Sequence, residues 1–254
     1  MPTIDDYNRF GKNLERYLCL KTSPIAVKML EKESDIPEGA IRPKKDKGYH
    51  LAQCQVFSMT RRHGMTIAML KEDHWCWAPL LGYGLVDEPN NPTVDAFPTL
   101  PRFDRGKYIG IVTAPLKSVT FEPDMVLIYS NNAQLREMLT MVVFPEKKLV
   151  KSEFNPIDSC IYSIVPVILD GQYRITLPDP GEAERAFSDD DEIIFSVPKD
   201  KIEALAQEIA QRAARNEETQ EKAPDWALGM YMPDFPRPDF YKDLFRQWGL
   251  DVED

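Results

Sequence analysis

The sequence predicts an α/β or α+β fold in which one mixed sheet is flanked by helices. Short apolar segments typical of strands alternate along the chain with segments whose apolar residues recur at helical spacing. The chain has 254 residues, 43% of them hydrophobic, which is enough to bury a large core. The sequence shows no internal repeat, so we expect a single domain and not a repeat architecture.

The chain begins with an expected amphipathic helix and a buried strand. Thr3 caps the helix, Asp6 stands near the capping-box position, and apolar residues recur at helical spacing to about Leu20. A strand over Ile25–Leu30 precedes a polar, proline-bearing loop over Glu31–Gly48. The elements expected next are a helix over Tyr49–His63 ended by Gly64, a strand over Met65–Leu70, a charged turn over Lys71–His74 and a short helix over Trp75–Leu81.

The second half of the chain predicts further strands and helices after a proline-rich loop over Asp87–Phe103. Within the apolar segment Ser159–Leu169 we expect a helix near Cys160 that is broken or kinked at Pro166. The other expected elements are strands over Tyr108–Pro115 and Met125–Tyr129, a helix from Asn131 or Asn132 to about Val143, a strand over Tyr173–Leu177, a loop over Pro178–Arg185, a strand over Glu192–Val197 and a helix over Lys199–Arg215.

Two regions of different composition are expected. Residues 1–216 form the α/β domain, and residues 217–254 form a C-terminal extension rich in aromatic residues and proline. A tail this apolar is expected to pack on the body or against a partner subunit. The extension is therefore the candidate surface for a homo-oligomer.

Charge and hydropathy exclude several partners. The net charge of −10 opposes non-specific binding to nucleic acid, which needs a cationic surface. The apolar runs are far shorter than a membrane span, and the first residues lack the apolar centre of a secretory signal. We therefore expect a cytoplasmic protein that acts on a small molecule, with no nucleic-acid or membrane partner.

Four cysteines are the residues best suited to metal or thiolate chemistry. Their spacing is long and contains no CxxC pair, so spacing alone favours buried, inert thiols over a shared metal site. Placement favours a site more strongly. Cys54 is expected in the middle of the second helix, Cys76 at a strand-to-helix junction and Cys160 near a helix start, where backbone N–H groups stabilise a thiolate. Three thiolates from separate elements can thus converge on one cluster.

Other polar and aromatic residues near these cysteines leave alternatives open. His74 follows Asp73 and precedes Cys76 closely, so it is a metal ligand, a base oriented by a carboxylate, or a surface turn residue. Arg185 follows a Gly-bearing loop and either binds an anion or makes a surface salt bridge. Trp75 and Trp77 line an apolar pocket, shield a cluster from water, or belong to ordinary core.

Several common functional motifs are missing from the sequence. Gly82-Tyr83-Gly84 does not continue as GxGxxG, and neither a P-loop nor a GxSxG elbow is present. Dinucleotide binding, P-loop phosphate binding and an α/β-hydrolase elbow are therefore unsupported. The acidic run Asp189–Glu192 either binds a cation or forms a solvated start to a strand, and the second alternative is favoured because runs of charge are usually solvated.

Short motifs along the chain resemble the domain of unknown function 169 family. The resemblance starts with LKTSPIAVKML at Leu20–Leu30 and covers roughly residues 15–210. It continues through Cys54-Gln55, Arg61 or Arg62 with Gly64, Glu72-Asp73, Cys76, Leu81-Gly82, Ala114-Pro115-Leu116, Pro123 to Leu127, Cys160, Gly181 with Arg185, Asp190 to Glu192, and Val197-Pro198.

The resemblance implies that Cys54, Cys76 and Cys160 are the family-like cysteines and that Cys19 is not. Some relatives carry a further cysteine where this chain has Pro178-Asp179-Pro180, which leaves a three-cysteine site or no cluster. A [4Fe–4S] cluster on three thiolates has one iron open to a substrate, with Asp179, His74 or the substrate completing its shell.

Three functions are therefore weighed at this point. The first is an oxygen-sensitive iron–sulfur enzyme that works under anaerobic conditions. It would be a lyase or oxidoreductase that acts on a small anionic or aromatic substrate, with His74 and Arg185 as candidates for proton transfer and anion binding. The second is a non-catalytic module that binds a small molecule or metal near Trp75 and Trp77. The third is a structural subunit whose cysteines are core residues.

Overall fold

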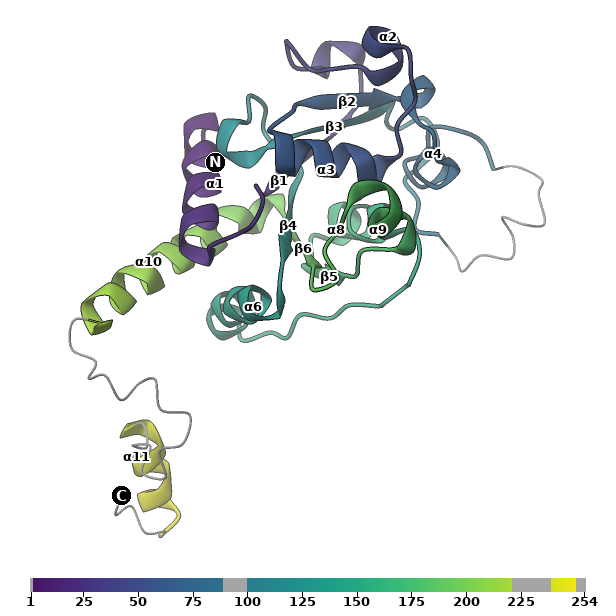
Figure 1. The fold of residues 1–254 in the computed structure, drawn as a ribbon. Coiled ribbons are helices and arrows are strands. Elements are labelled where there is room, and N and C mark those ends of the chain that lie inside the picture. Colours follow the sequence, from purple (N-terminus) through teal and green to yellow (C-terminus); the bar gives the residue numbers. More distant parts are fainter. Residues whose placement is uncertain (1, 89–99, 221–238, 250–254) are drawn as a thin grey trace. The chain divides into compact units, whose positions relative to one another are not determined.

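The computed structural model describes residues 2–88, 100–220 and 239–249, and it confirms the predicted fold class in its α+β form (Figure 1). Contacts divide the chain into two units, Met1–Ala213 and Ala214–Asp254. The first unit holds a six-stranded sheet in the order β2-β3-β1-β4-β6-β5. The strands are β1 Ile25–Leu30, β2 Ile67–Leu70, β3 Gly110–Pro115, β4 Met125–Ser130, β5 Arg174–Thr176 and β6 Ile193–Pro198.

All pairs among these strands are antiparallel, so the sheet is not the mixed sheet that the sequence predicts. Parallel pairing in the described residues is limited to two isolated bridges, Ile41 with Ile67 and Leu51 with His74. Strand β1 lies between β3 and β4, with Ala26 opposite both Ala114 and Val126. The segment at Ile25–Leu30 that the sequence predicts as a strand is thus a central strand, which agrees with its continuous burial pattern.

Helices cover both faces of the sheet (Figure 1). One face carries α1, α6 and α10, and the other carries α3, α4, α7 and α8. Helix α9 packs against α3. The helix bounds are α1 Ile4–Leu18, α2 Pro43–Lys47, α3 Gln53–His63, α4 Trp77–Gly82, α6 Asn132–Glu146, α7 Ser159–Tyr162, α8 Val165–Asp170, α9 Pro180–Ala186, α10 Ile202–Gln220 and α11 Asp239–Gln247.

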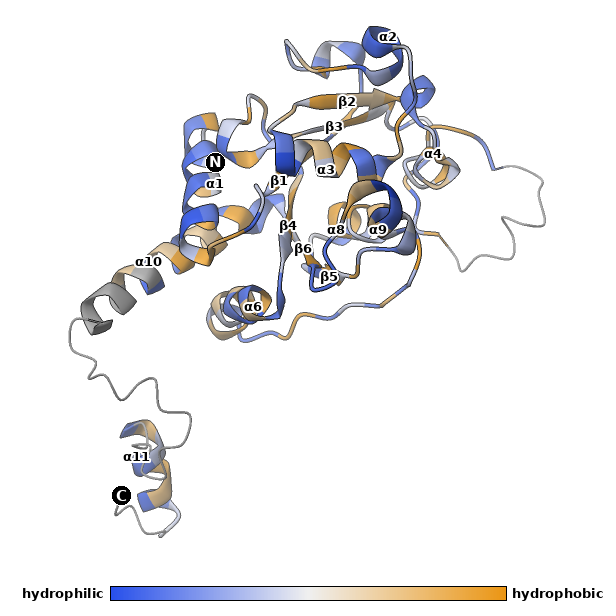
Figure 2. Cartoon of the chain, in the orientation of Figure 1, coloured by the Kyte–Doolittle hydropathy of each residue, from blue (hydrophilic) through white to orange (hydrophobic). Residues whose placement is uncertain are grey.

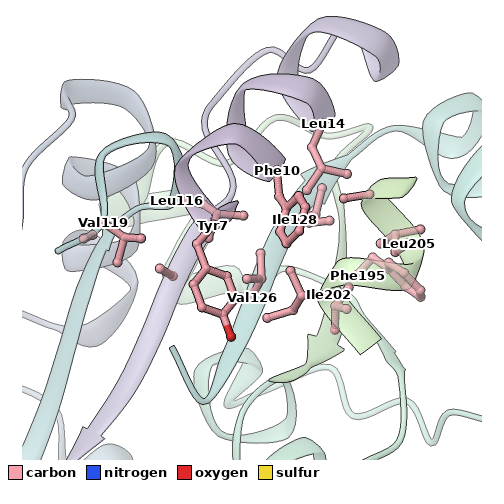
Figure 3. Close-up of a cluster of buried hydrophobic side chains, with 14 of the residues drawn as sticks. Tyr7, Phe10, Leu14, Leu116, Val119, Val126, Ile128, Phe195, Ile202 and Leu205 are labelled. Atoms are coloured by element: carbon pink, nitrogen blue, oxygen red, sulfur yellow. The ribbon is translucent and has the colours of Figure 1, made fainter. Parts of the chain in front are cut away.

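The first face is closed by the helix predicted at the N-terminus. Thr3 and Asp6 form the expected capping box, and Cys19 ends α1 in a left-handed conformation. Tyr7, Phe10 and Leu14 are buried against the sheet, beside apolar residues of β4, β6 and α10 (Figure 3). The buried strand β2 is strongly hydrophobic, whereas the mostly exposed helix α2 is hydrophilic (Figure 2).

Two local differences from the sequence prediction affect the functional site. The second helix starts at Gln53, not Tyr49, so Cys54 lies in its first turn and not in its middle. Pro178–Arg185 is not a loop, because Asp179 caps α9 and Pro180 occupies its first position. The helical segment near Cys160 is interrupted before Pro166, as predicted, and Pro166 is the second residue of the next helix, α8.

Other expectations fall outside the described residues or differ in detail. Most of the proline-rich loop, residues 89–99, and the tail before Asp239 are not described. The polar loop Glu31–Gly48 contains a short 3-10 turn at Glu33–Asp35 and helix α2. None of the described helices is both long and apolar enough to cross a membrane.

Candidate functional site

The starts of α3 and α4 are tied together, which brings Cys54 and Cys76 into one region. The backbone N–H of Leu51 donates to Asp73, and the N–H of Trp75 donates to the carbonyl of Leu51, at 3.0 and 2.9 Å. Cys54 is the second residue of α3, and Cys76 directly precedes α4. Both thiols belong to one small cluster with Ala52 and Ala186.

The third thiol reaches this region on helix α7. Cys160 is the second residue of α7, which packs against α4. Asp179, the N-cap of α9, accepts hydrogen bonds from the backbone N–H and the hydroxyl of Ser159, at 3.0 and 3.1 Å. The Asp179 carboxylate therefore joins the starts of α7 and α9, and it holds Cys160 near α3.

The Cys54 and Cys76 thiols both act on the ionisation of Cys160. Burial raises the pKa of Cys160 well above its usual value, and the nearby Asp179, Cys54 and Cys76 raise it further. Burial likewise raises the pKa of Cys76, while a hydrogen bond from the Ala78 backbone N–H lowers it. The pKa of Cys54 rises to about 12, mainly through burial. Without a positive partner these thiols stay protonated at neutral pH.

Acidic residues surround the thiols, and the positive charge that acts on two of them is Arg185. Glu182 and Asp179 raise the pKa of Cys54, whereas the charge and a hydrogen bond of Arg185 lower it. Burial and Asp179 raise the pKa of Asp158, which precedes Ser159, to about 6. The Cys54 thiol also lies 3.9 Å from the carbonyl oxygen of Gly181. The site accumulates negative charge whenever a thiol ionises, so it favours a cation.

Arg185 is held in place by its surroundings. Its guanidinium lies 5.3 Å from the ring centre of Trp75, a cation–π distance. Its buried Nε has no hydrogen-bond partner. A side chain at Gly181 would collide with this guanidinium, so glycine leaves the room that Arg185 needs beside Cys54.

Glu182 is a buried carboxyl that sequence analysis missed. It accepts hydrogen bonds from the hydroxyls of Tyr129 and of Ser159, the latter at 2.8 Å. Only 1% of the residue is exposed, and burial raises the pKa of Glu182 to about 7. The pattern Asp179-Pro180-Gly181-Glu182 is a capping-box signature that could have placed this residue on a helix.

The acidic run Asp189–Glu192 is only partly solvated. Glu192 is buried and forms a two-pronged ion pair with Arg61, at 2.5 and 2.8 Å. The Arg61 guanidinium also lies 3.9 Å from the ring centre of Tyr129. Sequence analysis names Arg61 only as a residue of the family resemblance and gives it no role. The pair instead fastens α3 to the start of β6 beside the Glu182 network.

The histidine and tryptophans of the sequence prediction lie at different depths. His74 is 7% exposed, both ring nitrogens lack hydrogen-bond partners, and burial lowers its pKa to about 4. It is therefore neutral at pH 7 and is not a surface turn residue. Trp75 is 62% exposed and Trp77 is 38% exposed, so neither is ordinary core. Cys19 is exposed at the end of α1.

The thiols are not arranged around a single ion. Among the described residues, no three His, Cys, Asp or Glu side chains stand close enough together to hold one metal ion. The thiolates of a cubane cluster bind different irons, so they stand farther apart than the ligands of one ion.

The fold and site define an α+β protein in which three thiols lie at or just before the starts of three helices, α3, α4 and α7. A family model matches residues 13–208, and its description reads "Uncharacterised ArCR". The chain belongs to this family, the domain of unknown function 169 (DUF169) family, as its sequence motifs predicted. No curated protein and no solved structure matches the chain.

Proposed function

We propose that this chain is an iron–sulfur protein in which Cys54, Cys76 and Cys160 hold a cluster, [4Fe–4S] in type. One observation carries the proposal. Three thiols from segments far apart in the sequence come together by packing, since Cys76 packs with Cys54 and α7, which carries Cys160, packs against α4. Cys54, Cys76 and Cys160 would hold the cluster as thiolates, and its iron would supply positive charge beside Asp179 and Glu182 in addition to that of Arg185.

We further propose that the protein is an oxygen-sensitive enzyme of the cytoplasm, acting on a small anionic or aromatic substrate. A cluster on three thiolates leaves one iron open to act as a Lewis acid, which suits lyase-type chemistry. Arg185 is placed to orient an anionic group, and the exposed face of Trp75 is placed to contact an aromatic one. His74 is a neutral imidazole, able to accept a proton only after a change in its surroundings.

The test is iron and acid-labile sulfide content after isolation without oxygen. Each of the variants Cys54→Ser, Cys76→Ser and Cys160→Ser should remove most of the bound iron and of the thiolate-to-iron absorbance. Cys19→Ser is the matched control, because Cys19 is exposed at the end of α1 and is not one of the three proposed ligands. This variant should keep the iron and sulfide content of the wild-type protein. Protein that contains neither iron nor sulfide, even after anaerobic reconstitution, would refute the proposal.

A structural role for the cysteines is the competing hypothesis. The raised pKa values of Cys54, Cys76 and Cys160 favour it, because protonated buried thiols behave as small hydrophobic residues. Under that hypothesis the three serine variants lose stability but no chromophore. Iron content in the wild-type protein therefore separates the two.

A further inference from the structure

A second candidate binding site lies away from the thiols, at the outer edge of the sheet. A cavity of about 710 Å³ is lined by the segment 150–154, by β5 and by residues of α7 and α8. Tyr162 lines it, whereas Cys160 does not. Two residues on a helix point in nearly opposite directions, so the cavity and the thiols lie on different sides of α7.

The segment 150–154 is fastened to the edge strand and forms one wall of the cavity. The backbone N–H of Ile175 donates to the Ser152 hydroxyl at 2.7 Å, which leaves the Ser152 proton free to donate elsewhere. Val150, Phe154 and Pro166 add apolar wall. Phe154 is 60% exposed at the rim, a costly position for a large aromatic side chain unless something covers it.

The charges around the cavity leave a positive excess. An adjoining cavity of about 330 Å³ shares Val150, Lys151 and Arg174 with the first and adds Lys148 and Glu146. Arg174 pairs with Asp170, and Glu146 pairs with Lys201. Lys148 donates to the neutral side chain of Gln172. Among the charged residues that line the two cavities, Lys148 and Lys151 therefore have no acidic partner, and Glu153 is the one acid without a basic partner, in a chain whose net charge is −10.

We propose that this cavity binds a carboxylate with an apolar body, of the size of a medium-chain fatty acid or an alkylbenzoate. The volume falls in the range that holds small molecules, and the walls are apolar with a few polar groups that fix orientation. Lys151 holds the carboxylate, the Ser152 hydroxyl donates to it, and Phe154 covers the body. The proposal is independent of the iron–sulfur hypothesis, because it uses none of the thiol-site residues.

Calorimetric titration of the full chain with decanoate tests the proposal. The wild-type protein should bind decanoate, and both Phe154→Ser and Lys151→Glu should raise the Kd about tenfold or more. Phe144→Ser is the matched control, because Phe144 is 75% exposed and lines neither cavity, and its Kd should equal that of wild type.

Three outcomes would overturn the proposal. The first is that neither decanoate nor 4-butylbenzoate binds. The second is that decanol binds as tightly as decanoate, which would remove the role of the anion. The third is that Phe144→Ser weakens binding as much as Phe154→Ser does, which would show contact elsewhere on the surface.

Discussion

Glu182 should make the folded protein less stable as the pH rises through its titration range. Its pKa in the folded chain is about 7, above the ordinary value of 4.5, because the carboxyl is buried. Between these values the folded state holds a proton that the unfolded state has lost, so the free energy of unfolding falls with rising pH by about 3 kcal/mol. Urea unfolding of wild type at pH 4.5 and at pH 7.5 measures the fall.

The variant Glu182→Gln should flatten this dependence. A glutamine oxygen accepts the bond from Tyr129, and its amide donates to the Ser159 hydroxyl, so the network survives without a titrating group. Glu184→Gln on the same helix is the control, since the Glu184 side chain is 74% exposed, and it should keep the wild-type slope. A Glu182→Gln slope equal to that of wild type would show that other groups set the dependence.

The individual residues of the site were predictable from the sequence, but their proximity in the folded chain was not. Cys54, Cys76 and Cys160 stood out by type and by the family resemblance. Their convergence depends on the β-bridge between Leu51 and His74 and on the hydrogen bond that the Ser159 hydroxyl donates to the Asp179 carboxylate. Both join segments that are far apart in the chain. Local spacing carries no information about such contacts.

At the scale of elements, the N-cap of α9 is expected to hold the site together. Asp179 accepts from the Glu182 backbone N–H at 2.7 Å and from Ser159. Asp179→Ala should lower the free energy of unfolding by about 1–2 kcal/mol through the lost cap, with a further loss from Ser159. Asp179→Asn keeps an acceptor oxygen and should lose less. Equal losses in urea unfolding would mean that the charge, and not the cap, matters.

The packing of α1 on the turn after β3 should be sensitive to one methyl group. A Cβ at Gly11 would collide with the backbone N of Lys117 and lie 2.7 Å from the carbonyl carbon of Leu116. Alanine gains about 1 kcal/mol in helix propensity, but backbone on the far side cannot give way, so Gly11→Ala should lose about 1–3 kcal/mol. Thermal unfolding against Lys12→Ala, an exposed neighbour, measures this. A rise in Tm for Gly11→Ala would show that the turn relaxes.

Elements with strong local signals were predicted well, whereas helix α9, which begins with proline and glycine, was not. The capping box of Thr3, the strand Ile25–Leu30 and the stop at Gly64 all match the structure. Helix α9 was predicted as a loop because Pro180 and Gly181 are common in turns. The same proline is favourable at the first helical position once Asp179 serves as the cap.

At the scale of the whole molecule, the sequence predicts strands and helices but not how the strands pair. The order of strand, cap and helix at Met125–Glu146 resembles the start of a parallel βαβ unit, yet β4 pairs with β6 in the antiparallel sense. The chain after α6 passes through α7, α8, β5 and α9 before it returns in β6. Pairing over such distances depends on which faces the helices must cover, and both faces here are closed by helices.

The C-terminal extension should control self-association of the whole chain. Phe240 and Leu244 in helix α11 and Trp248, which directly follows the helix and donates its backbone N–H to the carbonyl of Leu244, recur every four residues, and all three are exposed. Burying these side chains between two chains would stabilise a dimer by roughly 1.5–3 kcal/mol for each of them. Leu244→Glu should therefore shift the protein to smaller species in size-exclusion chromatography with light scattering, whereas Asp243→Ser on the polar side should not. Identical masses for wild type and Leu244→Glu at every concentration would exclude association through α11.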